Sequence, residues 1–134
     1  MTLTATGFTA KFDARVPICA NKENCADACE ASLAAHGIRV TGAGKMTPTH
    51  VVEADSPLVK TLLDCYTAYT GVTDPQPIAI GGGTYVHDIP GGVAFGCDFP
   101  GFDPKMHSAN EQASVDNLLK SAKIFALAIA QLCR

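Results

Sequence analysis

The stretch Gly81-Gly82-Gly83-Thr84-Tyr85 follows an apolar run at residues 77–80, and His107-Ser108-Ala109-Asn110-Glu111 lies further along the chain. Three consecutive glycines after an apolar run predict that the backbone leaves a buried strand. We expect it to turn there in ways that a Cβ atom would forbid, with its N–H groups open to a ligand. His107 is expected in a polar loop before a helical pattern, where its imidazole can point into a cleft. Each feature alone is common, but together with their flanks the two stretches indicate a site.

Composition narrows the classes of protein that fit this chain. Its 134 residues, 47% of them apolar, suit one domain or two small pieces with an ordinary core. A formal net charge of -3 provides no basic face, so neither nucleic acid nor an anionic membrane is an expected partner. The longest apolar stretch, residues 124–133, is too short to span a bilayer, and the first residues lack the pattern of a signal peptide. We therefore expect a soluble, cytoplasmic protein.

The chain has six cysteines, which raises the question of disulfides or a metal site. No C-x-x-C pair occurs, and four of the six fall within helical patterns where a small apolar residue fits. This favours scattered reduced cysteines, with a redox or metal role as the alternative. A nucleophilic triad of Cys97, His107 and an acid is disfavoured, because the surroundings of Cys97 have the pattern of a buried strand.

The first 54 residues predict the order β-α-β-β. Residues 8–15 carry β-branched and aromatic residues in loose alternation, which indicates a strand. Residues 24–36 have apolar positions at helical spacing, and Gly37 supplies a stop signal. Residues 38–41 and 49–54 then predict two short strands joined by a glycine-containing turn.

The remaining residues predict the order α-β-β-α, and the character of the sequence changes near Asp55. Residues 56–71 begin with a Ser-Pro start signal and end at a glycine, which predicts a helix. Residues 77–80 and 93–97 are apolar without alternation, so we expect strands covered on both faces. A last helix is predicted over residues 114–132. The fold class expected for the chain is α/β, with an α+β piece before it.

The quoted stretches carry a family resemblance. The run I-G-G-G-T-Y-V-H-D-I-P-G-G-V-A-F-G from Ile80, then F-P-G and H-S-A-N-E, resembles the carboxyl-terminal end of the zinc dipeptidases of the M20 metallopeptidase family. Within that family it is similar to the bacterial Xaa-His dipeptidases of the PepV, carnosinase-like type. The resemblance runs from about Phe12 to Leu132, and these enzymes are several times longer. It implies that residues 1–54 are the last part of a lid domain and that residues 55–134 complete the catalytic domain.

The resemblance also assigns a metal ligand. His107 matches the His of the family's H-x-A-N-E motif, which is a terminal ligand of the second of two zinc ions. The general base and the other ligands belong to H-x-D and E-E type motifs that are absent here, so no catalytic residue is assigned to this chain. The resemblance implies that Glu111 either supports the metal ligand without contacting the metal itself or lies beside the substrate. Alternatively, it is an acidic residue that favours the approach to the following helix.

Four further residues are implied to bind the substrate. Arg15 lies in F-D-A-R-V-P, which is similar to the family's lid segment N-x-R-Y-P, whose arginine grips the substrate carboxylate. The match is partial, because two of the motif's positions differ. Gly82, Gly83 and Thr84 would offer backbone N–H groups to the same end of a peptide, although glycines also simply permit a tight turn.

The other three histidines are assigned less specifically. His87 follows the glycine turn at a position where relatives vary, so it either contacts the substrate or lies on the surface, and the surface interpretation is favoured. The same holds more strongly for His36 and His50.

Taken together, the resemblance implies a piece of a zinc-dependent dipeptidase that hydrolyses unblocked dipeptides. Alone, the chain is expected to be inactive and to bind zinc weakly at most, because a single imidazole does not make a zinc site. Its expected partners are the dipeptide substrate and either the missing amino-terminal part of the enzyme or a second copy of the chain. The alternative is a non-catalytic, dimerising or binding module left from a truncated peptidase.

Overall fold

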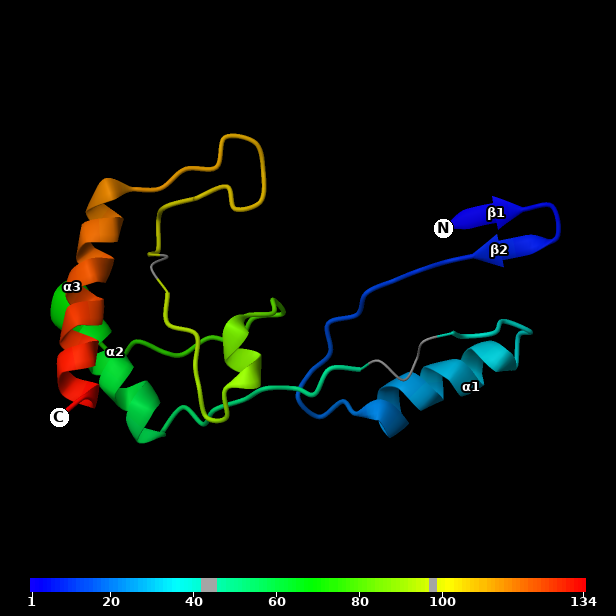
Figure 1. Ribbon diagram of the computed structural model, residues 1–134, viewed down its shortest axis with the longest axis horizontal. Helices are drawn as coiled ribbons and strands as arrows, with labels where there is room; N and C mark the ends of the chain where they lie inside the picture. Colours follow the sequence, from blue (N-terminus) through cyan, green and yellow to red (C-terminus); the bar gives the residue numbers. More distant parts are fainter. Residues whose placement is uncertain (42–45, 97–98) are drawn as a thin grey trace. The chain divides into compact units, whose positions relative to one another are not determined.

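The computed structural model describes residues 1–41, 46–96 and 99–134 (Figure 1). The chain divides into two compact units, Met1–Val51 and Val52–Arg134. The assignment of these units to a lid and a catalytic domain stays a prediction. Across the described residues, no helix combines the length and the apolar character needed to cross a membrane.

The first unit begins with a small antiparallel hairpin. Strands β1 (Thr2–Thr4) and β2 (Gly7–Thr9) pair with Leu3 opposite Phe8, and all six residues are exposed. The strand predicted over residues 8–15 is therefore mostly wrong, because pairing stops at Thr9 and residues 10–15 follow as irregular chain. The alternation of those residues suits a strand, but no neighbouring strand among the described residues offers them hydrogen bonds.

The helix predicted over residues 24–36 is present, with different bounds. A π-helical turn, η1 (Lys22–Asp27), leads directly into α1 (Ala28–Ala34). Asn21 caps the turn: its Oδ1 accepts from the N–H of Asn24 at 2.9 Å, and Asn24 Oδ1 accepts from the N–H of Asn21 at 2.8 Å. This reciprocal pair satisfies two donors at the helix start, so the helix begins earlier than its apolar pattern indicates. Gly37 follows with a φ of +72°, which suits glycine.

The two short strands predicted after α1 do not form. Residues 38–41 and 49–54 are irregular, and the glycine-containing turn predicted between them lies at residues 42–45, outside the described residues. Their β-branched residues fit a pleated surface, but a strand also needs a partner for its N–H and C=O groups. Among the described residues of this unit, the only ladder is the β1–β2 hairpin.

The second unit is built on two capped helices, α2 (Pro57–Thr70) and α3 (Val115–Leu132). Ser56 Oγ accepts from the N–H of Val59, and Ser114 Oγ accepts from the N–H of Asn117, both at 3.3 Å. Gly71 ends α2 with a φ of +69°. Both predicted helices are thus confirmed, because serine at the N-cap and glycine at the end act locally.

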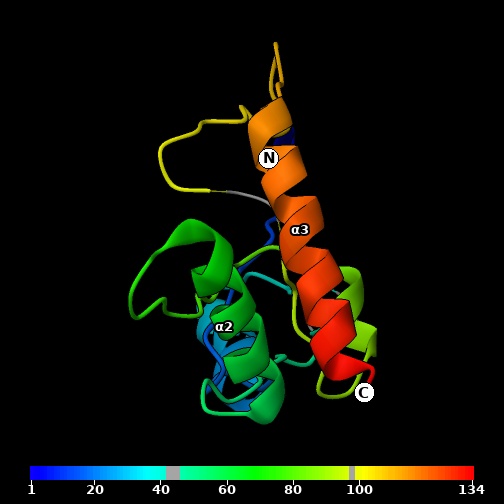
Figure 2. The same cartoon turned by 90° about the vertical axis from the view of Figure 1, so that its left-hand side faces the viewer.

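Helices α2 and α3 pack side by side (Figure 2). Their shared core is formed by Leu62 and Cys65 of α2 and by Ile124 and Ala128 of α3. Burial raises the pKa of the Cys65 thiol above its ordinary value, since the charged thiolate is disfavoured in this apolar contact. The five described cysteines are unpaired: Cys19, Cys25, Cys29, Cys65 and Cys133.

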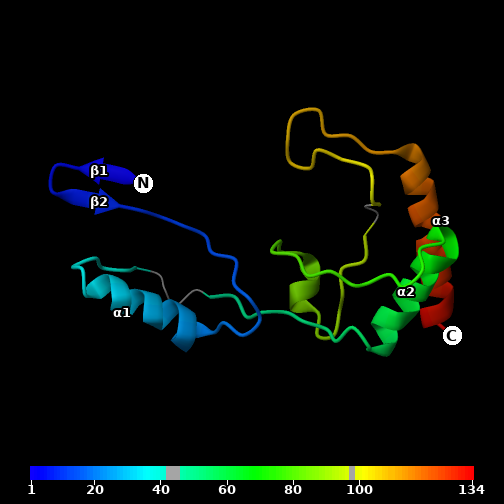
Figure 3. The same ribbon diagram turned by 180° about the vertical axis from the view of Figure 1, so that it is seen from behind.

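Residues 71–114 connect the two helices as a long excursion, and its described part includes a 3₁₀ turn, η2 (Tyr85–Asp88) (Figure 3). Part of it packs on the helix pair through aromatic rings. The Phe95 ring meets that of Phe125 edge to face at a centroid distance of 5.4 Å, and Phe99 stacks on Tyr66 at 6.1 Å. Lys120 Nζ lies 5.1 Å from the centre of the Phe99 ring. Aromatic contacts, rather than a sheet, thus hold this segment.

The two buried strands predicted for this excursion are wrong in this structure. Residues 77–80 form no ladder, and the side chains of Ile78 and Ile80 are 85% and 61% exposed. Residues 93–96 are also irregular, although Val93 and Phe95 pack against the core, and Cys97 lies outside the described residues. The cover that the apolar pattern predicts is present in part for Val93 and Phe95 and absent for Ile78 and Ile80. The described part of the unit contains no sheet that could supply it.

Helix α3 presents a second apolar face that α2 does not cover. At 3.6 residues per turn, the exposed apolar side chains follow one arc of the helix that adjoins the core residues. They include Val115, Leu118, Leu119, Phe125, Ile129 and Leu132. The charged residues of the helix, Asp116, Lys120 and Lys123, lie on one flank, outside this arc. We call this set of six residues the outer face of α3.

Candidate functional site

His107 lies in a closed loop between residues 103 and 112, just before α3 (Figure 1). The N–H of Gln112 donates to the carbonyl oxygen of Pro104 at 3.0 Å, and Gln112 Nε2 donates to that of Asp103, also at 3.0 Å. At the opening of the loop, Asp103 Oδ1 accepts from the N–H of Lys105 at 2.9 Å. The placement of His107 in a polar loop leading into a helix is as expected.

The backbone of this loop is unusual. Lys105, His107 and Asn110 all have left-handed conformations, with φ values of +53°, +60° and +61°. Each costs a residue with a Cβ about 1 kcal/mol relative to ordinary conformations, and such positions concentrate at functional sites. Ser108 braces the turn, since its N–H and its Oγ both donate to the carbonyl oxygen of Lys105, at 3.0 and 2.6 Å. The His107 side chain is exposed, so its imidazole is accessible to a ligand.

Glu111 is exposed and precedes the N-cap Ser114. The acidic residue in the first turn of α3 is Asp116, which is better placed to interact with the helix dipole. Because that interaction falls off beyond the first turn, a helix-favouring role explains Glu111 less well than it explains Asp116. A role beside His107 stays a prediction.

The glycine turn differs from the expectation. Neither Gly82 nor Gly83 has a positive φ. A Cβ on Gly82 would meet only Ile80 Cδ1, at an ordinary 3.8 Å, and a Cβ on Gly83 would meet nothing within 4 Å. The prediction that these residues turn in ways a Cβ would forbid is therefore wrong for Gly82 and Gly83. Both are exposed, and among the described residues neither N–H has an acceptor. They are open to a ligand, but this chain alone does not require glycine there.

Thr84 serves as the cap of η2. Its Oγ1 accepts from the N–H of Val86 at 3.2 Å, and its N–H lies 3.4 Å from Nδ1 of His87. The backbone donor of Thr84 is thus already directed at His87. It offers less to a ligand than the donors of the two glycines before it. His87 itself is exposed and takes part in this cap, which the sequence did not indicate.

Arg15 lies in the first unit, on irregular chain after the hairpin. Its Nε is 3.6 Å from Asp13 Oδ1, and its side chain is 66% exposed. An exposed pair at this distance interacts weakly, so the guanidinium remains available for a carboxylate. His107, Glu111 and the glycine turn all belong to the second unit.

The donor set fits zinc only in part. The exposed imidazole of His107 is a suitable ligand, but a catalytic zinc site uses about three protein ligands. Among the described residues, no group of three or more His, Cys, Asp or Glu side chains is close enough to hold a metal ion. The described residues alone therefore form no three-ligand zinc site, and the role of His107 as a zinc ligand stays a prediction.

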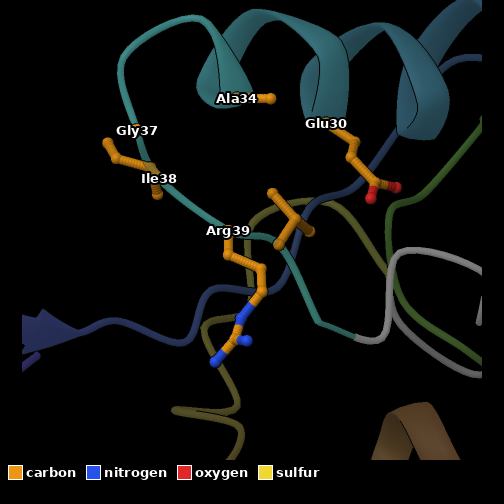
Figure 4. Close-up of a pocket in the computed structure, with 6 residues that line it drawn as sticks. Glu30, Ala34, Gly37, Ile38 and Arg39 are labelled. Atoms are coloured by element: carbon orange, nitrogen blue, oxygen red, sulfur yellow. The ribbon is translucent and has the colours of Figure 1, made fainter.

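A separate hollow of about 250 Å³ lies beside α1 in the first unit (Figure 4). Its lining includes none of the residues that the sequence predicts for the site. Glu30 of α1 and Arg39 carry opposite charges, and Figure 4 shows the Arg39 side chain extending away from the helix. The remaining lining residues are Ala34, Gly37, Ile38 and Val40. No ion pair between Glu30 and Arg39 is present among the described residues.

The known proteins to which this chain is similar are named putative dipeptidases. No family model matches the chain, and no solved structure matches it. The chain is 42% identical over 93 residues to "Putative dipeptidase YtjP" of Bacillus subtilis, a match that covers 69% of this chain and 20% of the relative. It is 39% identical over 90 residues to a "Putative dipeptidase" of Staphylococcus epidermidis, covering 67% and 19%. The chain thus spans about a fifth of the length of the curated relatives it matches, and these relatives are named dipeptidases.

Proposed function

We propose that this chain is the carboxyl-terminal part of a zinc-dependent dipeptidase of the M20, Xaa-His type, an enzyme of the cytoplasm that hydrolyses unblocked dipeptides. The observation that carries the proposal is the similarity to proteins named dipeptidases, which extends over about two thirds of this chain but only a fifth of their length. The exposed His107, on a strained and hydrogen-bonded turn, supports a role as one zinc ligand.

The residues of this chain would orient the metal and the substrate. Two zinc ions, when bound, supply an activated water at neutral pH. His107 holds one position in that centre, with Glu111 beside it. Arg15 would bind a substrate carboxylate through two parallel hydrogen bonds, and Gly82 and Gly83 would offer their N–H groups to the peptide.

The chain alone would be inactive, because its described residues gather no group of three metal ligands and no general base is assigned to it. Two further features support a missing partner. The irregular segments at 77–80 and 93–96 pair with no strand among the described residues, and most of the outer face of α3 is exposed, with Phe125 in contact with Phe95. The remaining sheet of a catalytic α/β domain would satisfy both, with residues 1–54 belonging to a lid and residues 55–134 to that domain.

The outer face of α3 also supports a second candidate function, a non-catalytic module that dimerises. A wide exposed apolar face on a helix marks a surface for interaction, and a second copy of the chain could supply the cover. This candidate needs no metal and predicts a concentration-dependent dimer.

The test measures hydrolysis of an Xaa-His dipeptide such as Ala-His with added zinc. It compares the 134-residue chain with a chimaera in which the chain replaces the matching segment of the Bacillus subtilis relative. We expect activity only in the chimaera. His107→Ala should lower it at least about 100-fold, because loss of a ligand costs no less than loss of a supporting group. His36→Ala, an exposed histidine in the first unit, is the matched control and should have no effect.

An inactive chimaera that binds no zinc would refute the dipeptidase proposal. If light scattering then found the isolated chain to be a dimer, the second candidate would be favoured.

A further inference from the structure

We propose that Gln112 is a positioning residue that holds the His107 turn closed, so that the imidazole is presented to the metal in one orientation. This inference rests on the proposed function, in which His107 is a zinc ligand. It assigns a role to a residue that lies outside the recognisable H-S-A-N-E motif.

Gln112 ties the two ends of the loop together. Its backbone N–H donates to Pro104 and its side-chain Nε2 donates to Asp103, each at 3.0 Å, so a single residue joins the end of the loop to its opening. Nine positions separate Gln112 from Asp103, and His107 lies between them. The bonds inside the loop, from Ser108 to Lys105 and from Lys105 to Asp103, connect near neighbours only. Of the bonds described for this loop, those of Gln112 are the ones that close it.

The closed loop is joined to the rigid part of the unit. Gln112 shortly precedes the N-cap Ser114, whose hydroxyl fixes the first turn of α3. A small hollow of about 60 Å³ lies between the base of the loop and that first turn, and it is lined by Pro104, Gln112, Ser114 and Leu118 among others. The orientation of the loop is therefore set by a helix that the unit's core holds in place.

The closing bond of Gln112 matters because the loop contains residues in costly backbone conformations. Lys105, His107 and Asn110 are all left-handed; asparagine adopts this conformation readily, whereas for Lys105 and His107 it is costly and the surroundings must hold it. The loop is mostly exposed, so little apolar burial opposes its relaxation. When the Gln112 side-chain bond is lost, these residues can return to ordinary conformations, and the direction of the His107 side chain changes with its backbone.

The chemistry of this position calls for an amide. Asp103 offers a carbonyl oxygen, which needs a donor, and the Nε2 group of glutamine provides one. A glutamate at position 112 would have the same size but would place a carboxylate oxygen against that carbonyl. Gln112→Glu thus removes the side-chain bond to Asp103, keeps the backbone donor that bonds to Pro104, and changes the side-chain volume very little.

The test compares Gln112→Glu with Gln76→Glu. Gln76 is a matched control, because it is an exposed glutamine of the same unit whose Nε2 also donates to a neighbouring oxygen, Asp74 Oδ1, at 2.8 Å. Two quantities are measured. The first is the amide hydrogen exchange of Ser108 and Gln112 in the 134-residue chain, by NMR. The second is the zinc affinity of the dipeptidase chimaera, by competition with a chelator.

In Gln112→Glu we expect exchange at both amides to rise about fivefold or more, since a closing hydrogen bond is lost. Zinc affinity should fall about 10- to 100-fold, as for other groups that orient a metal ligand. Gln76→Glu should change neither quantity. The melting temperature of the α2–α3 core should stay the same in both variants, which would show that the unit is still folded.

Faster exchange with unchanged zinc affinity would overturn the proposal, because Gln112 would then close the loop without positioning a ligand. Unchanged exchange would overturn it as well. A failure of the proposed function gives a different result: His107→Ala would leave the zinc affinity of the chimaera unchanged, and both proposals would fall together.

Discussion

Two isoleucines of α3 lie on different apolar faces of the helix, one on each. Ile124 is 3% exposed and packs with Leu62, Cys65 and Ala128, whereas Ile129 lies on the outer face and is 61% exposed. Truncating each to alanine removes the same three carbon atoms from the same helix. The difference in the free energy of unfolding therefore measures how well each face is covered in the isolated chain.

The expected magnitudes follow from burial. Three buried methylene-sized groups contribute about 2.4 kcal/mol, and the cavity left behind adds to this, while alanine's better helix propensity returns about 0.4 kcal/mol. We expect Ile124→Ala to lower the free energy of unfolding by about 3 kcal/mol. At Ile129, the exposed fraction of 61% leaves a transfer contribution of about 1 kcal/mol. Helix propensity offsets part of that, so Ile129→Ala should cost only about 0.5 kcal/mol.

The assay is urea unfolding of the 134-residue chain, followed by circular dichroism at several protein concentrations. Equal losses for the two variants would refute the reasoning, because the outer face would then be covered in solution. In the dipeptidase chimaera, by contrast, Ile129→Ala should cost about 2–3 kcal/mol if the rest of that protein covers the face. A loss in the isolated chain that grows with protein concentration would identify a second copy as the cover.

Three further outcomes are expected. Arg15→Lys should raise the KM of the chimaera for an unblocked dipeptide about 10- to 100-fold with little change in kcat, because a bidentate contact with the substrate carboxylate is lost. An equal rise in KM for a dipeptide amide, which has no such carboxylate, would contradict this. Gly83→Ala should leave the free energy of unfolding of the isolated chain unchanged, because the added Cβ meets open space. In the chimaera it should lower kcat/KM about tenfold or more if the substrate approaches the turn closely. Cys65 is fully buried and its pKa is raised, so at pH 8 a thiol reagent should label exposed Cys19 first and Cys65 only as the unit opens. The labelling rates are measured by mass spectrometry. Equal rates for the two cysteines would show that the α2–α3 core is not formed.

The parts of the fold that the sequence predicts correctly are those set by local interactions. Ser56 and Ser114 cap their helices through a hydroxyl that reaches only a few residues along the chain, and Gly71 ends α2 through its own φ. Such signals act wherever the chain is placed. The strand signals failed for the opposite reason. The apolar run at residues 77–80 indicates a strand that would need apolar cover and a hydrogen-bonding neighbour, but it does not indicate which part of the chain supplies them.

The candidate site follows the same division. The motif placed His107 in a loop before a helix, as found, because a polar run next to a helix-start signal is a local pattern. The left-handed turn and its closure by Gln112 were missed. A signal was available: the Asp-Pro pair at 103–104 favours a turn, and a side-chain amide follows at the end of the same polar run. The sequence could not show that the amide reaches back to Asp103, since that contact depends on the path of the whole loop.

The glycine turn and the outer face of α3 lead to one argument about what this chain lacks. Gly82 and Gly83 have ordinary φ values and room for a Cβ, so nothing described within the chain requires glycine there. The outer face of α3 is likewise apolar, and of its six residues only Phe125 has a described ring contact, with Phe95. Local physics accounts for neither feature, although local physics explains the caps, the helix ends and the loop closure. A ligand close to the turn and a sheet against α3 would account for both, and the proposed dipeptidase is the assembly that supplies the two together.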